Sequence, residues 1–296
     1  MKYRHAYHAG NFADLHKHVA LVALLRLLQQ KDKGLLFVDT HAGRGRYALG
    51  GGEARMTGEA LAGAGAVLAA LQGQTDVEPE LADYAAVIVG WRRASGARHD
   101  YPGSPLIAAQ LLRPQDRGVA IESQPAEFEA LRKALGRDAR VTAEHGDGYA
   151  RLRALLPPAT RRGLVLIDPP YEDSRADFRA AAAAMHAALE RFETCVIAIW
   201  YPVKDARDTD RWLQELAREL ARPACAAELW VHPPDSRAGL NGSGLVVVNP
   251  PWHFAQRCEI WQAALWPMLA RAGAGAGTDG GSGGGSRVVS LAGERR

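Results

Sequence analysis

Hydrophobic residues recur along this chain in two patterns, short apolar runs and helical repeats, which alternate over most of its length. Apolar positions three to four residues apart predict an amphipathic helix across residues 12–31 (Leu15, Val19, Val22, Leu25 and Leu28). Apolar runs predict buried strands at 35–39, 118–122, 140–144, 163–167, 195–200, 226–231 and 243–248. Helical spacing predicts helices between them, at 105–113, 125–136, 149–156, 174–191, 205–221 and 254–270.

This alternation predicts an α/β fold with a mostly parallel seven-stranded sheet and helices on both faces. Two segments depart from the alternation. Residues 53–98 are rich in Ala, Leu and Glu and predict a helical insertion subdomain. Residues 272–286 are almost entirely Gly, Ala, Ser and Thr, so we expect 272–296 to be a flexible tail. Residues 1–52 and 99–271 then form the main domain, with 1–18 as an N-terminal arm and the start of the first helix.

Composition narrows the class of protein only slightly. No apolar run is long enough to span a membrane, and the polar N-terminus lacks the apolar stretch of a signal peptide. The 3 cysteines are scattered, which suits reduced thiols, so we expect a cytoplasmic protein. The net charge of +3 favours polyanionic partners only weakly.

Acidic residues follow several of the predicted strands. In an open parallel sheet, ligands bind beyond the carboxyl ends of the strands. Those ends carry Asp39 to Gly43, Glu122, Asp147 with Gly148, and Asp168. The loop after the first strand has neither the Lys-Ser/Thr of a P-loop nor a full GxGxxG, and the carboxylates would repel a pyrophosphate.

The same acidic residues match the polar groups of a nucleoside. Glu122 suits the two hydroxyls of a ribose, because a carboxylate can accept from both. Asp147 can accept from an adenine amino group, and Asp39 or its neighbours can hold an ammonium. A ligand with adenine, ribose and a charged amino-acid tail but no phosphate is S-adenosylmethionine, which we therefore expect as the cofactor.

The strand at 163–167 runs directly into Asp168-Pro169-Pro170-Tyr171. The Asp168 carboxylate and the Pro169 carbonyl are acceptors for an exocyclic NH2, and the Tyr171 ring could stack on a planar base. This arrangement predicts methyl transfer to the N6 of an adenine, with Asp168 as the catalytic acceptor. A second site of this kind, Asn249 to Trp252, follows a strand that we expect to be antiparallel, so we predict that it is structural.

The N-terminal arm is aromatic and basic, with Tyr3, His5 and Lys17 among its residues. Such an arm suits single-stranded RNA through stacking and phosphate contacts. A polar arm packed on the edge of the sheet is an equally good interpretation. The spacing of its histidines matches no metal site, so we expect no metal.

Taken together, these segments resemble the bacterial 23S rRNA adenine-N6 methyltransferases of the RlmJ family. The matching pieces are Tyr3 to His5, His8 to Asn11, Ala13-Asp14, Lys17-His18, Asp39 to Gly43, Tyr101 to Pro105, Asp147-Gly148, Asp168 to Tyr171, Trp200 to Val203 and Asn249 to Trp252. The resemblance implies a Rossmann-like class I fold dependent on S-adenosylmethionine, with a small helical insertion. One departure is Ser123 after Glu122, where a His would be expected.

The resemblance also assigns roles to residues of this chain. It implies cofactor contacts at His18, His41, Ser104, Glu122, Asp147, Gly148 and Asp168. It further implies an RNA contact at Tyr3, with His5 and Lys17 near the substrate. The expected partner is 23S rRNA, protein-free or in an early assembly intermediate, and we expect a monomer that binds no membrane.

Two alternatives stay open at this point. The tetrapeptide at Asp168 serves adenine in DNA as well as in RNA, although no second basic recognition domain is evident. A catalytically silent RNA-binding protein could also have kept this fold.

Overall fold

An eight-stranded sheet forms the centre of the molecule. The computed structural model describes residues 9–49, 59–233, Ser236, 239–272 and 283–292. The strands lie in the order β10-β8-β9-β7-β6-β1-β4-β5. Their bounds are β1 (Leu36–Asp39), β4 (Arg117–Glu122), β5 (Val141–His145), β6 (Gly163–Ile167), β7 (Val196–Val203), β8 (Ala224–Trp230), β9 (Gly242–Val248) and β10 (Gly285–Ala292).

The sheet is mostly parallel, as predicted. β1 pairs in parallel with both β4 and β6, β4 with β5, and β6 with β7. β9 is antiparallel to β7 and β8, which confirms the direction expected for the strand before Asn249. All the predicted strands are present, but the predicted number of seven is wrong because β10 adds an edge strand.

β10 also corrects the prediction of a flexible tail over 272–296. Residues 285–292 pair antiparallel with β8. Arg287 on β10 forms ion pairs with Glu228 on β8, whose side chain is 2% exposed, and with Asp210. A strand that follows a glycine-rich segment at the edge of a sheet leaves little pattern in the sequence, because its stability comes from pairing with a distant strand. Residues 273–282 and 293–296 lie outside the described part of the chain.

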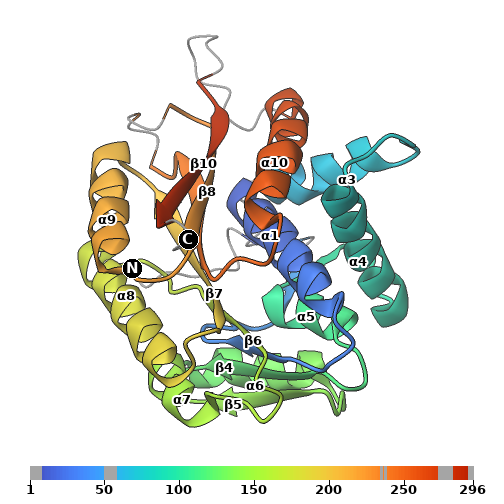
Figure 1. Cartoon of the computed structure of the whole chain (residues 1–296). Coiled ribbons are helices and arrows are strands. Elements are labelled where there is room, and N and C mark those ends of the chain that lie inside the picture. The colour runs from blue at the N-terminus through green and yellow to red at the C-terminus, as the bar shows by residue number, and fades with distance from the viewer. Residues whose placement is uncertain (1–8, 50–58, 234–235, 237–238, 273–282, 293–296) are drawn as a thin grey trace.

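Helices cover the two faces of the sheet and bury two separate cores (Figure 1). One face carries α1 (Phe12–Gln29), α4 (Pro79–Ser95), α5 (Ser104–Leu111), α6 (Pro125–Leu135) and α10 (Phe254–Arg271). The other carries α7 (Gly148–Leu155), α8 (Ser174–Arg191) and α9 (Ala206–Glu219). Alternate residues of β6 point to opposite faces, with Leu164 and Leu166 in the α1-side core and Val165 and Ile167 in the α8-side core.

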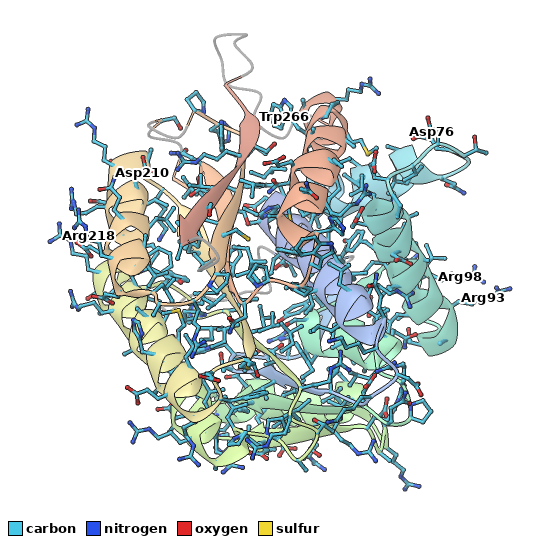
Figure 2. All side chains as sticks on the ribbon, viewed as in Figure 1. Asp76, Arg93, Arg98, Asp210, Arg218 and Trp266 are labelled. Carbon is cyan, nitrogen blue, oxygen red and sulfur yellow. The ribbon has the colours of Figure 1, made fainter. Side chains whose placement is uncertain are left out.

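The segment predicted to be a helical insertion is mostly helical over its described residues, with a break at 72–78. It contains a π-helical turn, η2 (Leu61–Gly65), followed by α3 (Ala66–Leu71) and α4, which packs against α1 and α5. Two short strands, β2 (Arg46–Ala48) and β3 (Asp100–Pro102), flank this segment in the sequence and pair antiparallel with each other. Figure 2 shows Arg93 near the end of α4 and Arg218 on α9 pointing away from the body of the molecule.

The chain order brings the acidic strand ends to one edge of the sheet. After β1 the chain builds β4 and β5 on one side of β1 and then returns to form β6 on its other side. The carboxyl ends of β1 and β6 therefore meet where the strand order reverses, the place where ligands bind in such sheets. Among the described residues, no helix is both long and apolar enough to cross a membrane.

Candidate active site

Asp168 stands at the carboxyl end of β6 with one carboxylate oxygen bound and one available. Its side chain is 13% exposed. Lys17 Nζ donates to Asp168 Oδ2 over 2.6 Å. Oδ1 accepts no hydrogen bond within the part of the chain that the structure describes. The carboxylate is thus held by one oxygen and offers the other to a ligand.

Lys17 links Asp168 to a second carboxylate, that of Asp14. Lys17 lies on α1, is 5% exposed, and its Nζ is 2.8 Å from Asp14 Oδ1. Burial alone would lower the pKa of Lys17, but the charges and hydrogen bonds of the two carboxylates raise it above its ordinary value, so the ammonium stays charged. The sequence prediction placed Lys17 near the substrate, and the structure places it against Asp168. Asp14 was missed, although its i,i+3 spacing from Lys17 on a helix could have indicated the pair.

Asp39, the last residue of β1, is fully buried. Ser104 Oγ donates to Asp39 Oδ2 over 2.6 Å, and the backbone N–H of His41 donates to Oδ1 over 3.2 Å. Burial raises the pKa of Asp39 to about 7, and the nearby charge of Asp168 adds to this rise. Because its carboxylate is enclosed, the expectation that Asp39 itself holds an ammonium is not supported.

The bond from Ser104 also corrects a local prediction. The sequence Ser104-Pro105 predicts Ser104 as the N-cap of the following helix. In the structure Gly103 occupies the N-cap position, and Ser104 begins α5 with its hydroxyl turned to Asp39. A side chain that can cap its own helix is here bonded to a buried carboxylate on another element, which the local sequence does not reveal.

Glu122 fastens the loop after β1 to the end of β4. Its Oε2 accepts from Gly43 N over 2.9 Å, and its Oε1 accepts from Gln124 N over 2.7 Å. His41, in the same loop, is half-buried, and its Nδ1 lies 2.8 Å from Thr40 Oγ1. Burial lowers the pKa of His41 to about 4, so the imidazole is neutral at pH 7. Both residues therefore border the carboxyl edge of β1.

Asp147 and Gly148 open α7 at the same edge. Asp147 is the N-cap, and its Oδ1 accepts from Tyr149 N over 2.9 Å and from Ala150 N over 3.3 Å. A Cβ on Gly148 would lie 2.0 Å from the carbonyl oxygen of Thr40. Only glycine allows the start of α7 to approach the β1 loop this closely.

Four other predicted site residues are His18, Pro169, Tyr3 and His5. His18 is buried on α1, with its Nδ1 2.7 Å from the Tyr101 hydroxyl, and its cofactor contact stays a prediction. Pro169 is buried directly after Asp168. Tyr3 and His5 lie outside the described residues.

The stacking role predicted for Tyr171 is not supported by the structure. Its side chain is 2% exposed, and its ring packs against those of Phe178 and Trp200. Its hydroxyl donates to the carbonyl oxygen of Trp200 over 2.7 Å. Its φ of 49° turns the chain at this point, so the ring lies in the α8-side core. The direction of this ring could not be predicted from the sequence, because few residues other than glycine adopt a positive φ.

The set of ligand atoms at this edge suits S-adenosylmethionine. Glu122, Asp147 and Asp168 are acceptors, which match ribose hydroxyls, an amino group and a positively charged tail, and they would repel phosphates. Within the described residues no cluster of three or more His, Cys, Asp or Glu side chains is placed to hold a metal.

Comparison with known proteins agrees with this geometry. The family described as "Ribosomal RNA large subunit methyltransferase D, RlmJ" matches residues 32–278. Ribosomal RNA large subunit methyltransferase J of Escherichia coli strain K12 is 40% identical over 278 residues, which cover 94% of this chain and 97% of that protein. The protein of the same name from Haemophilus influenzae is 39% identical over the same shares of the two chains.

A solved structure matches the fold across almost the whole chain. Protein LPL1258 of Legionella pneumophila strain Philadelphia 1 superposes with a TM-score of 0.79 and 31% identity, covering 96% of this chain and 98% of its own. The match of the family over most of the chain, together with relatives of this identity and coverage, establishes the kinship. The chain belongs to the RlmJ family of ribosomal RNA large subunit methyltransferases.

Proposed function

We propose that this protein transfers the methyl group of S-adenosylmethionine to the exocyclic N6 of an adenine in 23S rRNA. The observation that carries the proposal is the state of Asp168, whose Oδ2 is held by Lys17 while its Oδ1 accepts no hydrogen bond from the described residues. Family membership supports large-subunit rRNA as the substrate. The acidic strand ends support the cofactor.

The chain's own residues would position the amine and not deprotonate it in advance. The lone pair of adenine N6 is delocalised into the ring, so the nitrogen is a poor nucleophile. Hydrogen bonds from its two hydrogens to Asp168 Oδ1 and to the Pro169 carbonyl favour a more tetrahedral nitrogen whose lone pair points at the methyl group. Fixed acceptors of this kind lower the barrier through preorganisation and orientation.

The reaction balances without a metal or an oxidant. When bound, the cofactor would supply a methyl group on a sulfonium. The N6 lone pair would form the new N–C bond as the S–C bond breaks, and the sulfur would leave as a neutral thioether. The nitrogen then carries a positive charge and loses one proton, to which Asp168 is the nearest acceptor, and the proton passes on to solvent. Lys17 holds the Asp168 side chain in place, because its ammonium donates to Oδ2.

We further propose the residues that hold the cofactor. Glu122 and Asp147 would contact the ribose and the adenine, with Gly148, His41, Ser104 and His18 lining or supporting the same edge. Tyr3, His5 and Lys17 would lie toward the RNA. A base in a duplex cannot reach Asp168, so the target adenine must be unpaired or flipped.

The first test uses Asp168→Asn with protein-free large-subunit rRNA and labelled S-adenosylmethionine. We expect a fall in kcat of about a hundredfold or more, because asparagine has one oxygen and cannot accept from both Lys17 and the adenine amino group. Asp138→Asn is a matched control, since Asp138 precedes β5 at the opposite edge of the sheet and pairs with Arg140. Methylation by Asp168→Asn at the rate of the control would contradict the assignment.

The second test separates the proposed substrate from its rivals. The products are digested to nucleosides and N6-methyladenosine is identified by mass spectrometry. Methyl transfer to duplex DNA and not to rRNA would identify a DNA enzyme. A wild-type preparation could also bind rRNA, bind S-adenosylmethionine by calorimetry and still transfer no methyl group. That result would identify a silent RNA-binding protein.

A further inference from the structure

Trp200 stands beside Asp168 on the neighbouring strand. β6 and β7 pair in parallel with Ile167 opposite Ile199, so the next residues along, Asp168 and Trp200, lie side by side. Lys17 Nζ binds Asp168 Oδ2 at 2.6 Å and lies 5.6 Å from the centre of the Trp200 ring. The carboxylate and the indole therefore flank the same ammonium, and the indole is only half-buried.

The alternation of the strands places Trp200 and Tyr171 differently with respect to this site. Residues Leu166 and Ala198 face the α1-side core, whereas Ile167 and Ile199 face the α8-side core. One step further along each strand, Asp168 and Trp200 return to the α1 side, where Lys17 meets both. Tyr171 is buried in the opposite core. Trp200 borders both cores, and its ring also packs against that of Tyr171, but of the two rings it is the indole that Lys17 meets.

A buried polar network fixes the orientation of this indole. Trp200 Nε1 donates to Ser243 Oγ over 2.9 Å, and Ser243 Oγ donates in turn to the carbonyl oxygen of Ala13 over 3.4 Å. His16 Nδ1 lies 2.9 Å from the same hydroxyl, and Gln262 Nε2 donates to His16 Nε2 over 2.7 Å. Since His16 Nε2 accepts, its Nδ1–H is the donor to Ser243.

Burial of these polar side chains costs free energy, and their hydrogen bonds hold the Trp200 indole in one orientation. Burial lowers the pKa of His16 to about 3, so it stays neutral, and the five residues of the network come from four elements, α1, β7, β9 and α10. Trp212, which packs in the α8-side core, has no hydrogen-bond partner for its Nε1 among the described residues, whereas the Nε1 of Trp200 is anchored. Polar networks that join several elements in this way favour one arrangement of the groups that they hold.

We infer that Trp200 is the aromatic contact for the target base, in the role that the sequence suggests for Tyr171. This inference rests on the proposed function, and it adds the surface against which the adenine packs while Asp168 binds its amino group. Ser243 and His16 are positioning residues that act through the indole.

The test measures methyl transfer to protein-free large-subunit rRNA by Trp200→Leu and Trp200→Phe. Loss of a base–aromatic contact is expected to lower kcat/KM for RNA by about 10- to 100-fold in Trp200→Leu, while Trp200→Phe stays within about threefold of wild type. The dissociation constant for S-adenosylmethionine, measured by calorimetry, should not change in either variant. Trp252→Leu is the matched control, because Trp252 is 74% exposed and follows β9 at the opposite edge of the sheet.

Two results would overturn the inference. One is a kcat/KM for RNA in Trp200→Leu equal to that of wild type. The other is a parallel loss of cofactor affinity and of RNA turnover, which would mark Trp200 as structural. If Trp200→Leu does not fold, Ser243→Ala keeps the indole and removes the acceptor of its N–H. The Ser243→Ala variant should have a lower kcat/KM for RNA and an unchanged affinity for the cofactor. An unchanged kcat/KM for RNA in this variant would also overturn the inference.

Failure of the inference can be told apart from failure of the proposed function. If the wild-type protein forms no N6-methyladenosine in rRNA, the proposed function is wrong. If the wild-type protein forms it and Trp200→Leu does so equally well, only the role of Trp200 is wrong.

Discussion

Replacement of Lys17 by Met tests how much the buried ammonium stabilises the fold through its bonds to Asp14 and Asp168. Lys17 is 5% exposed and bridges Asp14, which is 3% exposed, and Asp168, which is 13% exposed. Methionine fills nearly the same volume but removes the ammonium that lies between the two carboxylates. Removal of one partner from a buried ion pair costs about 3–5 kcal/mol, since the remaining charge stays desolvated.

The cost should depend on pH with a definite sign. In the variant, the two desolvated carboxylates lose the ammonium between them, so the folded state is penalised for as long as they are charged. A group with a raised folded pKa destabilises the fold above that pKa, and the deficit disappears as protonation proceeds at lower pH. In wild type, the pKa of Lys17 is itself raised, so its contribution is complete throughout the acid and neutral range.

Urea unfolding at pH 8 and at pH 5, followed by circular dichroism, measures this difference. We expect Lys17→Met to lose about 3–5 kcal/mol at pH 8 and clearly less at pH 5. Arg132→Met is the control, because Arg132 and Glu129 share the i,i+3 spacing of the Asp14–Lys17 pair but are 61% and 51% exposed. That variant should lose no more than about 0.5 kcal/mol. A loss in Lys17→Met that is as small as in the control, or that is equal at the two pH values, would refute the reasoning.

Two further predictions concern the loop after β1. The folded pKa of Asp39, about 7, lies above its unfolded value, so its stabilising contribution is complete below pH 4 and is lost as the pH rises through 7. Asp39→Asn should therefore remove a decline of up to about 4 kcal/mol in the unfolding free energy between pH 4 and 8, as measured by urea titration across that range. Gly148→Ala should weaken binding of S-adenosylmethionine at least about tenfold by calorimetry, because its Cβ would lie 2.0 Å from Thr40 O. Gly146→Ala, whose Cβ would have nothing within 4 Å, should leave that affinity unchanged.

Most of the secondary structure could be predicted from hydrophobic spacing. α8 spans Ser174–Arg191, the range predicted from its pattern, and α1 and α6 end within two residues of their predicted ends. The weak elements were missed. β2 and β3 are three residues each, too short to show a period, and β10 owes its stability to pairing with β8 and to the ion pairs of Arg287.

Asp39, Glu122, Asp147 and Asp168 could also be predicted from the sequence, because each lies at or within three residues of the end of a predicted strand, whereas Asp14 on α1 was missed. The environments of these residues could not be predicted. Asp39 and Asp168 look alike in the sequence, yet one carboxylate is enclosed by Ser104 and His41 while the other keeps an oxygen available. That difference depends on which helices pack over the two strand ends.

The sequence by itself determined the α/β alternation, the acidic strand ends and the Asp168 tetrapeptide, because these depend on residues close together along the chain. Tertiary structure alone decided which groups act together. It buried Tyr171, brought Lys17 from α1 to Asp168, and set Trp200 beside that carboxylate through the register of β6 and β7. Asp168 lies 32 positions from Trp200 and 151 positions from Lys17 along the chain. The pairing of strands and the packing of helices on the sheet set the distances between such residues.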